Sequence, residues 1–236
     1  MFVKGLAALN KLVEGTAQQG EDRPKATWLT LKANQTVTIT FLEEIDEESG
    51  EYNPAVGTLL VATEHSNPQN FKRKALCSRD TEGECYGCQM AQAHPRTGWK
   101  GRGRLYANVL VEGDGTKDPY VAILSQGIGD KSITPALVSF ANDNGSVTNI
   151  KFKLTRSGVG TATGYTIMPK IGSSGADVTK LELFDLEASC TRTVEYSKQK
   201  EYYGAFKTDE DLDAEADAAF NDSRPPTDGD ASSVEW

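Results

Sequence analysis

Four potential metal ligands lie in a stretch of the sequence that has no regular hydrophobic pattern. They occur in the order His-x11-Cys-x7-Cys-x2-Cys and are His65, Cys77, Cys85 and Cys88. Zinc prefers four tetrahedral ligands of this kind, and a Cys-x2-Cys turn lets two thiolates reach one ion. We therefore predict a closed, structural Zn²⁺ site. Its binding energy would stabilise residues 65–104, which lack the apolar residues for a core of their own.

Other assignments of these residues have to be weighed against the zinc site. His94, shortly after Cys88, and Cys190, far along the chain, both compete with His65 as the fourth ligand. The cysteines could also be ordinary reduced thiols. A Cys-x2-Cys pair in a protein without an export signal nevertheless favours metal or redox chemistry over a disulfide.

The sequence gives no support for an enzyme. Zinc nucleobase deaminases need a His-x-Glu motif and a proline before the Cys-x2-Cys pair, but Asn67 and Glu84 occupy these positions. Residues 127–132 lack the glycines of a phosphate-binding P-loop. In residues 158–164 the last glycine comes one place too late for a dinucleotide-binding motif. Both glycine-rich segments are better interpreted as turns, and we predict no catalytic activity.

The apolar segments are too short for a membrane helix, which needs about 20 residues; an example of the longest is residues 58–62. Polar side chains at Asn10, Lys11 and Glu14 interrupt the N-terminal segment, so it does not have the apolar centre of a signal peptide. We therefore expect a soluble intracellular protein with reduced cysteines.

Alternating and helical patterns elsewhere in the chain predict a mainly β fold. Residues 36–42 alternate apolar and threonine side chains, and residues 27–32 precede them across a short turn, so the two segments are expected to form a β-hairpin. Further strands are expected at residues 56–63, 105–111, 120–124, 150–154 and 165–168, and helices at residues 3–13, 134–141 and 182–195. About seven short strands indicate a compact barrel or sandwich with an irregular insert.

The negative charge of the chain is concentrated at its C-terminal end. The net charge is −9, but residues 208–236 contain ten acidic residues and one basic residue, which leaves residues 1–207 neutral. Such a tail is too acidic to fold alone. We expect it to compete with a nucleic acid for a basic groove and to recruit partner proteins, unless it serves solubility only. The expected partner contacts are Asp209, Glu210, Asp211, Asp213 and Trp236.

Basic and aromatic residues surround the cysteines. Residues 72–104 contain eight basic and three acidic side chains, with aromatic residues among and just beyond them. Basic side chains that neutralise phosphates, together with aromatic rings on which nucleobases stack, are typical of proteins that bind single-stranded nucleic acid without reading its sequence. The alternative is a solvated charged surface with the aromatic rings in the core. The candidate contacts are Lys72, Arg73, Lys74, Arg79, Trp99, Lys100, Arg102, Arg104, Tyr106 and Tyr120.

The order of these motifs resembles the gene-32-type single-stranded DNA-binding proteins of tailed bacteriophages. The resemblance covers roughly residues 26–206 and rests on the hairpin at residues 28–42, the His/Cys order, the segment Tyr106-Ala107-Asn108-Val109-Leu110-Val111 and the acidic tail. A late strand–turn–strand, residues 151–165, adds Arg156 and Tyr165 to the candidate contacts. Departures are Leu105, where the family often has a second aromatic residue, and the absence of a basic N-terminal arm.

The resemblance implies a fold and a function. The expected fold is an OB-fold barrel with an inserted zinc lobe at residues 65–104 and a cleft between them that holds single-stranded DNA. An N-terminal helix and linker (residues 1–25) would precede this core (residues 26–206), and an acidic tail (residues 207–236) would follow it. The implied function is to coat single-stranded DNA in replication, recombination and repair, in the cytoplasm of an infected bacterium. The alternative is a zinc-stabilised regulatory module that binds duplex DNA or an acidic partner.

Overall fold

The computed structural model describes residues 25–113, 118–173, 177, 180–208 and 211. The helix expected at residues 3–13 lies outside these residues. So do most of the acidic tail positions, namely Asp209, Glu210, Asp213 and Trp236.

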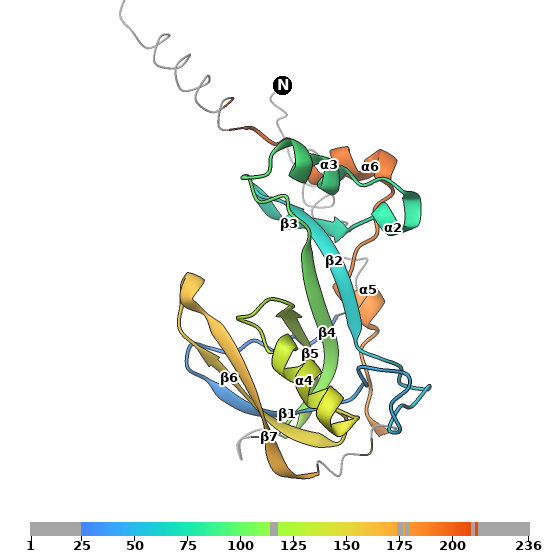
Figure 1. The fold of residues 1–236 in the computed structure, drawn as a ribbon, viewed down its shortest axis with the longest axis vertical. Helices are drawn as coiled ribbons and strands as arrows, with labels where there is room; N and C mark the ends of the chain where they lie inside the picture. The colour runs from blue at the N-terminus through green and yellow to red at the C-terminus, as the bar shows by residue number, and fades with distance from the viewer. Residues whose placement is uncertain (1–24, 114–117, 174–176, 178–179, 209–210, 212–236) are drawn as a thin grey trace, which may run out of the picture.

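Seven β-strands of the described chain form one sheet, and short helices flank it (Figure 1). The strands are β1 (Thr36–Phe41), β2 (Leu60–Asn67), β3 (Asn70–Leu76), β4 (Arg102–Val111), β5 (Tyr120–Gly127), β6 (Ile150–Ser157) and β7 (Gly164–Ser173). The helices are α2 (Arg79–Glu82), α3 (Tyr86–Ala93), α4 (Thr134–Asn144), α5 (Leu186–Cys190) and α6 (Tyr196–Tyr203), with a 3₁₀ turn, η1 (Gly160–Ala162).

Strand β4 is the centre of the sheet. The strand order is β3-β2-β4-β1-β6-β7, all pairs are antiparallel, and β5 pairs with the other edge of β4. Strand β2 pairs with residues 102–106 of β4, β1 pairs with residues 109–111, and β5 follows residues 104–111. The sheet is open in the described part of the chain, because β6 is the only strand that pairs with β7. A mainly β fold is confirmed, whereas a closed OB-fold barrel is not.

The sheet connects two regions, which we call the body and the lobe (Figure 1). The body comprises β1, β5, β6, β7, α4 and the second half of β4. The lobe comprises β3, α2, α3, α6 and the end of β2 that pairs with β3. The long strands β2 and β4 run from one region into the other. The backbone hydrogen bonds between these two strands therefore fix the orientation of the lobe relative to the body.

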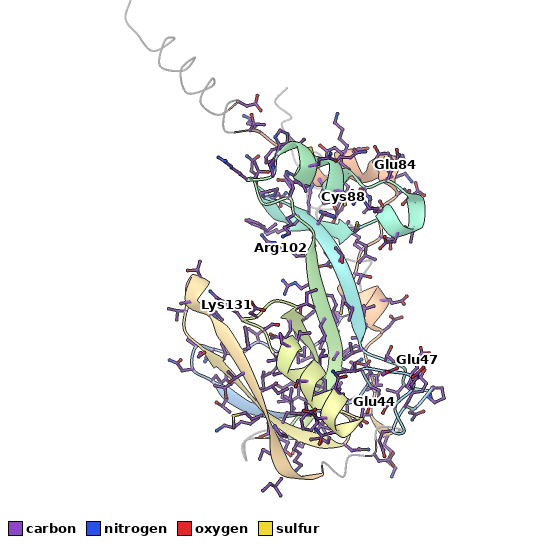
Figure 2. All side chains as sticks on the ribbon, in the orientation of Figure 1. Glu44, Glu47, Glu84, Cys88, Arg102 and Lys131 are labelled. Atoms are coloured by element: carbon purple, nitrogen blue, oxygen red, sulfur yellow. The ribbon has the colours of Figure 1, made fainter. Side chains whose placement is uncertain are left out.

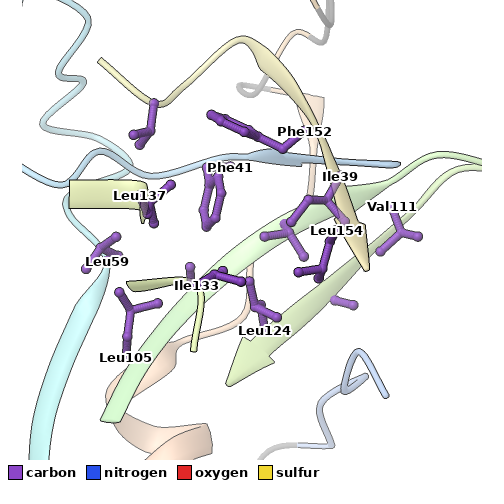
Figure 3. Packing of buried hydrophobic residues seen from close by; sticks show 14 of the residues in the cluster. Ile39, Phe41, Leu59, Leu105, Val111, Leu124, Ile133, Leu137, Phe152 and Leu154 are labelled. Carbon is purple, nitrogen blue, oxygen red and sulfur yellow. The ribbon is translucent and has the colours of Figure 1, made fainter. Parts of the chain in front are cut away.

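The core of the body is aliphatic with two phenylalanines (Figure 3). Its cluster contains fifteen buried residues of the described chain, including Ile39, Leu124 and Leu154, which are fully buried. The ring of Phe152 lies edge-on against Phe41 at 5.6 Å between centroids. Helix α4 covers this side of the sheet and places Leu137 in the same core.

Several elements lie where the sequence patterns predict them. Strands β4, β5, β6 and β7 contain the segments expected at residues 105–111, 120–124, 150–154 and 165–168. Helix α4 begins at Thr134, tolerates Pro135 in its first turn as expected, and ends at Asn144, where Gly145 follows in the left-handed conformation. The described residues also contain no helix that is both long enough and apolar enough to cross a membrane.

The predicted hairpin at residues 27–32 and 36–42 is wrong. Residue Trp28 forms a single parallel bridge with Ile123 of β5, and β1 pairs with β4 and β6 instead. The alternating pattern of Thr36–Phe41 correctly indicates a strand, but the buried side chains of Ile39 and Phe41 select apolar partners distant in the sequence. Alternation along one strand does not specify which strand lies next to it.

Two further sequence predictions are corrected. Residues 65–104 are not irregular, because they contain the β2–β3 hairpin and helices α2 and α3. Residues 182–195 are not one helix either: α5 ends at Cys190, and a separate helix, α6, begins at Tyr196. An extended link between α5 and α6 lets Leu76 donate its N–H to the carbonyl of Arg192 at 2.8 Å.

Candidate metal centre and basic surface

The four predicted ligands converge inside the lobe. Strand β2 carries His65, Cys77 directly follows β3, Cys85 precedes α3, and Cys88 lies in the first turn of that helix. One ligand atom from each residue lies within 4.8 Å of all the others. The Sγ atoms of Cys77 and Cys88 are 3.6 Å apart, and Nε2 of His65 is 3.3 Å from Sγ of Cys88. No disulfide joins these cysteines, so the residues form a candidate metal-binding site.

The imidazole of His65 is already oriented towards the sulfur atoms. Its Nδ1 lies 2.8 Å from the carbonyl oxygen of Trp99 and the side chain is buried. A carbonyl can only accept, so Nδ1 carries the proton in the neutral ring and the lone pair of Nε2 faces the cysteines. This is the arrangement by which proteins usually fix a metal-binding histidine.

Two glycines let the backbone approach the imidazole closely. A Cβ atom at Gly87 would lie 2.4 Å from Cγ of His65, far inside contact distance. At Gly101 a Cβ atom would lie 3.1 Å from Cε1 of the same ring. Any larger residue at position 87 would therefore displace the His65 side chain or the start of α3.

Hydrogen bonds and burial shift the pKa values of the candidate ligands His65, Cys85 and Cys88. Burial raises the pKa of the Cys85 thiol, but hydrogen bonds from His65 and from the backbone N–H groups of Cys88 and Ser78 outweigh it and lower the pKa to about 6. Burial alone would lower the pKa of His65, yet its hydrogen bonds with Cys85 and the Trp99 carbonyl raise that pKa to about 9. Burial raises the pKa of Cys88 to about 12. Metal binding would therefore release protons from these groups.

A residue that sequence reasoning missed, Gln199 of α6, holds the two cysteine turns together. Its amide oxygen accepts from the N–H of Tyr86, which follows Cys85, at 2.8 Å. Its amide nitrogen donates to the hydroxyl of Ser78, which follows Cys77, also at 2.8 Å. Gln199 is fully buried. A polar residue within a short helix gives no local signal of this role, because its partners lie more than a hundred residues away.

The aromatic residues near the cysteines build the core of the lobe. The indole of Trp99 is fully buried, edge-on against Tyr203 at 5.2 Å and against Tyr86 at 5.9 Å. A ring without exposed surface cannot stack on a nucleobase unless the lobe opens. Trp99 therefore does not belong to the exposed surface for which it was predicted, and its buried position matches the alternative of aromatic rings in the core.

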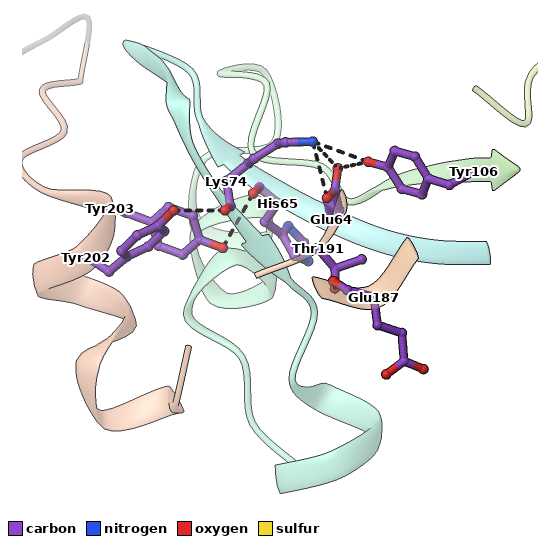
Figure 4. A network of polar contacts seen from close by, with 8 residues as sticks. All are labelled: Glu64, His65, Lys74, Tyr106, Glu187, Thr191, Tyr202 and Tyr203. Carbon is purple, nitrogen blue, oxygen red and sulfur yellow. Dashed lines mark hydrogen bonds and ion pairs between the residues drawn. The ribbon is translucent and has the colours of Figure 1, made fainter. Parts of the chain in front are cut away.

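A second polar network connects the lobe to the centre of the sheet (Figure 4). The buried carboxylate of Glu64 accepts from the hydroxyl of Tyr106 and from Nζ of Lys74, each at 3.1 Å. Burial, together with the charge of Glu64, raises the pKa of Tyr106, so the phenol remains a donor. Lys74 and Tyr106, both predicted to contact DNA, thus bind the Glu64 carboxylate; the Lys74 side chain is half-buried, whereas Tyr106 has about 1 % of its surface exposed.

The other predicted basic residues differ in what they contact. Arg73 donates to the carbonyl of Tyr202 at 2.7 Å and so caps the end of α6. The remaining members of the set are exposed or half-buried, and within the described residues their charged groups form no ion pair. They are Lys72, Arg79, Lys100, Arg102 and Arg104. Figure 2 shows Arg102 where β4 enters the lobe.

One cavity brings together predicted residues from distant parts of the chain. It measures about 350 Å³, and its lining includes Arg104 of β4, Tyr165 of β7 and the indole of Trp28. Next to it, Arg156 donates to the carbonyl of Leu31, another lining residue, at 2.6 Å. The predicted contact Tyr120 is not part of this group, because it lies at the opposite end of β5. It is 40 % exposed and pairs with Val111.

The alternative metal ligands lie elsewhere. The ring of His94 packs against Phe206 at 5.5 Å between centroids. Cys190 is buried in a separate cluster with Tyr106 and Ile123. The described part of the acidic tail includes Asp211, whose carboxylate accepts from the N–H of Thr208 at 2.8 Å.

Comparison with known proteins does not assign the chain to a family: no protein-family model, no curated protein and no solved structure matches it.

Proposed function

We propose that this protein binds single-stranded DNA without sequence preference, through a surface on β4 and β5, and that a zinc-stabilised lobe supports this surface. The observation that carries the proposal is the cavity beside β5, which is lined by Arg104 together with the aromatic residues Trp28 and Tyr165. A cation next to aromatic rings provides both a phosphate contact and a stacking platform. We propose no catalytic step.

The charges around this cavity support an anionic ligand. Its lining contains no aspartate or glutamate. Three other cavities of the described chain each contain acidic side chains: Asp80 and Glu187 in the first, Glu195 and Glu201 in the second, and Glu44 and Glu51 in the third. A carboxylate close to a phosphate costs free energy through like-charge repulsion. The second cavity also contains four basic side chains, Lys72, Arg73, Arg192 and Lys198, but among these four cavities only the one with Arg104 combines a basic side chain with a lining free of carboxylates.

Exposed cations extend this surface towards the lobe. Arg102 and Arg104 lie two residues apart on β4 and so project from the same face of the sheet. Lys100 precedes them and is also exposed. We propose that the phosphates of the bound DNA follow this row of basic side chains, which would place the DNA between the body and the lobe. We also propose that the body is related to the OB-fold, as the order of the motifs implies.

We further propose zinc as the metal of the lobe. For Zn–S and Zn–N bonds of about 2.3 and 2.0–2.1 Å, a tetrahedron has S–S edges of about 3.8 Å and N–S edges of about 3.6 Å. The corresponding distances are 3.6 Å between Cys77 and Cys88 and 3.3 Å between His65 and Cys88. Four protein ligands leave no open position, so the ion would be structural.

The test is a titration of the full-length protein with an unstructured oligothymidylate and with a matched duplex, at several salt concentrations. We expect binding of the single strand with an affinity that falls steeply with salt, by about 0.7 logarithmic units per phosphate contact for each decade. Arg104→Ala should weaken binding and reduce this slope. Lys153→Ala, which removes one exposed charge from β6, is the matched control and should leave both unchanged.

Two results would contradict the proposal. Equal or stronger binding of the duplex would favour the alternative, a zinc-stabilised regulatory module. Equal effects of Arg104→Ala and Lys153→Ala would show that net charge, and not this site, determines affinity. The proposed competition of the acidic tail with DNA, and its recruitment of replication proteins, fall largely outside the described residues and stay predictions.

A further inference from the structure

The cavity beside β5 has the features of a site for one flat ligand. Apolar side chains of Leu31, Leu124 and Leu154 form part of its wall, and the aromatic residues Trp28 and Tyr165 also line it. Four polar residues, Thr30, Arg104, Ser125 and Gln126, also line it and can fix the orientation of a ligand. Its volume of about 350 Å³ is at the lower end of the range of pockets that bind small molecules, which extends from about 300 to 1,000 Å³.

The indole of Trp28 is held in place although much of it is exposed. The backbone on both sides is fixed to β5: Leu29 donates to the carbonyl of Ile123 at 2.9 Å, and Ile123 donates to that of Thr27 at 2.7 Å. The ring also contacts Tyr106 edge-on, at 6.3 Å between centroids. Even so, 42 % of Trp28 is exposed. Exposing a large aromatic surface in a fixed position has a free-energy cost, which a stacking ligand would offset.

A buried amide lines the same cavity. Gln126 is about 5 % exposed, and its side chain makes no hydrogen bond with any other residue that the structure describes. A glutamine amide has two donor hydrogens and one acceptor oxygen, which suits the mixed donors and acceptors on the edge of a nucleobase. Arg104 supplies a positive charge at the same cavity.

We propose that this cavity captures a single unpaired nucleobase. The base stacks on Trp28, its edge meets the amide of Gln126, and its phosphate lies against Arg104. The proposal rests on the proposed function and deepens it, because it identifies the feature that separates single strands from duplex. In a duplex the pairing edge of each base is occupied and both of its faces are stacked, so no base is available without unpairing.

The first test compares Trp28→Ala with Phe71→Ala in the full-length protein. Phe71 is an even more exposed aromatic residue, on β3 of the lobe, and serves as the matched control. Loss of one stacked base by alanine substitution should weaken the affinity for oligothymidylate about 5- to 150-fold. Phe71→Ala should leave it unchanged. Equal affinities of Trp28→Ala and the unmodified protein would overturn the inference.

The second test distinguishes base capture from damage to the fold. The ligand is an abasic deoxyribose-phosphate oligomer of the same length, which offers phosphates but no base. We expect the unmodified protein and Trp28→Ala to bind it equally. If Trp28→Ala loses as much affinity for the abasic oligomer as for oligothymidylate, the variant has lost a phosphate surface and the inference fails.

Fluorescence gives a third, independent readout. In a full-length Trp236→Phe background, the remaining tryptophans are the exposed Trp28 and the buried Trp99. Oligothymidylate should quench the emission strongly, and adding Trp28→Phe should abolish that quenching. Quenching that persists would assign it to another ring.

If oligothymidylate binds and Arg104→Ala weakens binding but Trp28 variants do not, this inference fails while the proposed function stands. If oligothymidylate does not bind at all, both fail.

Discussion

The body and the lobe are stabilised in different ways. The body buries a continuous cluster of fifteen residues, most of them aliphatic, between its strands and α4. The corresponding cluster of the lobe contains three buried hydrophobic residues, Ala75, Trp99 and Tyr203, around the candidate metal ligands. The same chain thus combines a region with a large hydrophobic core and a region with a much smaller one.

The magnitudes predict that the lobe depends on a bound metal. A fully buried Val, Leu, Ile or Phe side chain contributes about 1.5–3 kcal/mol relative to an exposed one. The lobe has three buried hydrophobic residues with six partly buried ones against them, so its burial contributes much less than that of the body, and the entropy of ordering its segments must be subtracted. Structural zinc binding is worth about 10–16 kcal/mol in small domains at neutral pH. The lobe is expected to depend on this contribution, whereas the body is not.

Removal of the metal is the strongest test of this difference. Chelation should increase amide hydrogen exchange in β3 and α3, which the ligands hold together, and in α6, which Gln199 joins to both cysteine turns, and should leave β5 and β6 protected. Hydrogen exchange measured by mass spectrometry on the metal-bound and chelated protein would show this contrast. Uniform loss of protection would mean that the body depends on the metal as well.

Two cysteine variants give the matched comparison. Cys88→Ser should lose the metal, as measured by elemental analysis, because it removes one of four ligands. Cys190→Ser should retain it, because Cys190 lies in a separate buried cluster. Loss of metal from both variants, or from neither, would contradict the proposed ligand set.

Removing a large side chain from the core of the body should have a smaller effect, which lowers the stability of the whole protein. Phe152→Ala removes a ring that packs against Phe41 at 5.6 Å and Phe140 at 5.1 Å, and should lower the free energy of unfolding by about 3–5 kcal/mol. Urea unfolding followed by circular dichroism would measure it. The metal content should not change, because Phe152 belongs to the core of the body. The exposed Phe71→Ala should change stability by less than about 0.5 kcal/mol.

The smallest expected effect concerns the clamp inside the lobe. Gln199→Ala leaves the N–H of Tyr86 without its partner and removes the donor to the Ser78 hydroxyl, which keeps only its bond to the Glu84 carbonyl, at a cost of about 1–3 kcal/mol. We expect faster loss of metal to a competing chelator, followed by a colorimetric indicator. The control is Gln89→Ala, which removes an exposed hydrogen bond to Tyr196 between the same two helices. Equal rates in the two variants would show that Gln199 does not stabilise the site.

The sequence predicted those parts of the structure that depend on local pattern. Strand β4 and helix α4 follow from alternation and from Pro135 at a helix start. The ligand group at His65 and the three cysteines follows from residue type and spacing, because few arrangements of such ligands can surround one ion.

Tertiary contacts decided the features that the sequence did not predict. Residues 27–32 alternate like a hairpin strand, but what fixes Trp28 is its bridge to Ile123 of β5, almost a hundred residues away. Burial of aromatic residues was equally unpredictable: Trp99 lies in the core, whereas Trp28 remains exposed. The same residue type can stabilise a core or bind a ligand, and local sequence does not distinguish the two.

The position of Gln199 also has a consequence for the order of assembly during biosynthesis. Gln199 follows Tyr86, one of its hydrogen-bond partners, by 113 residues. At about 5–20 residues per second, a ribosome needs roughly 6–23 s to translate this distance. The four ligand residues therefore leave the ribosome well before their clamp does. A nascent chain can acquire its metal in this interval, while the site is still open on the side that α6 later covers.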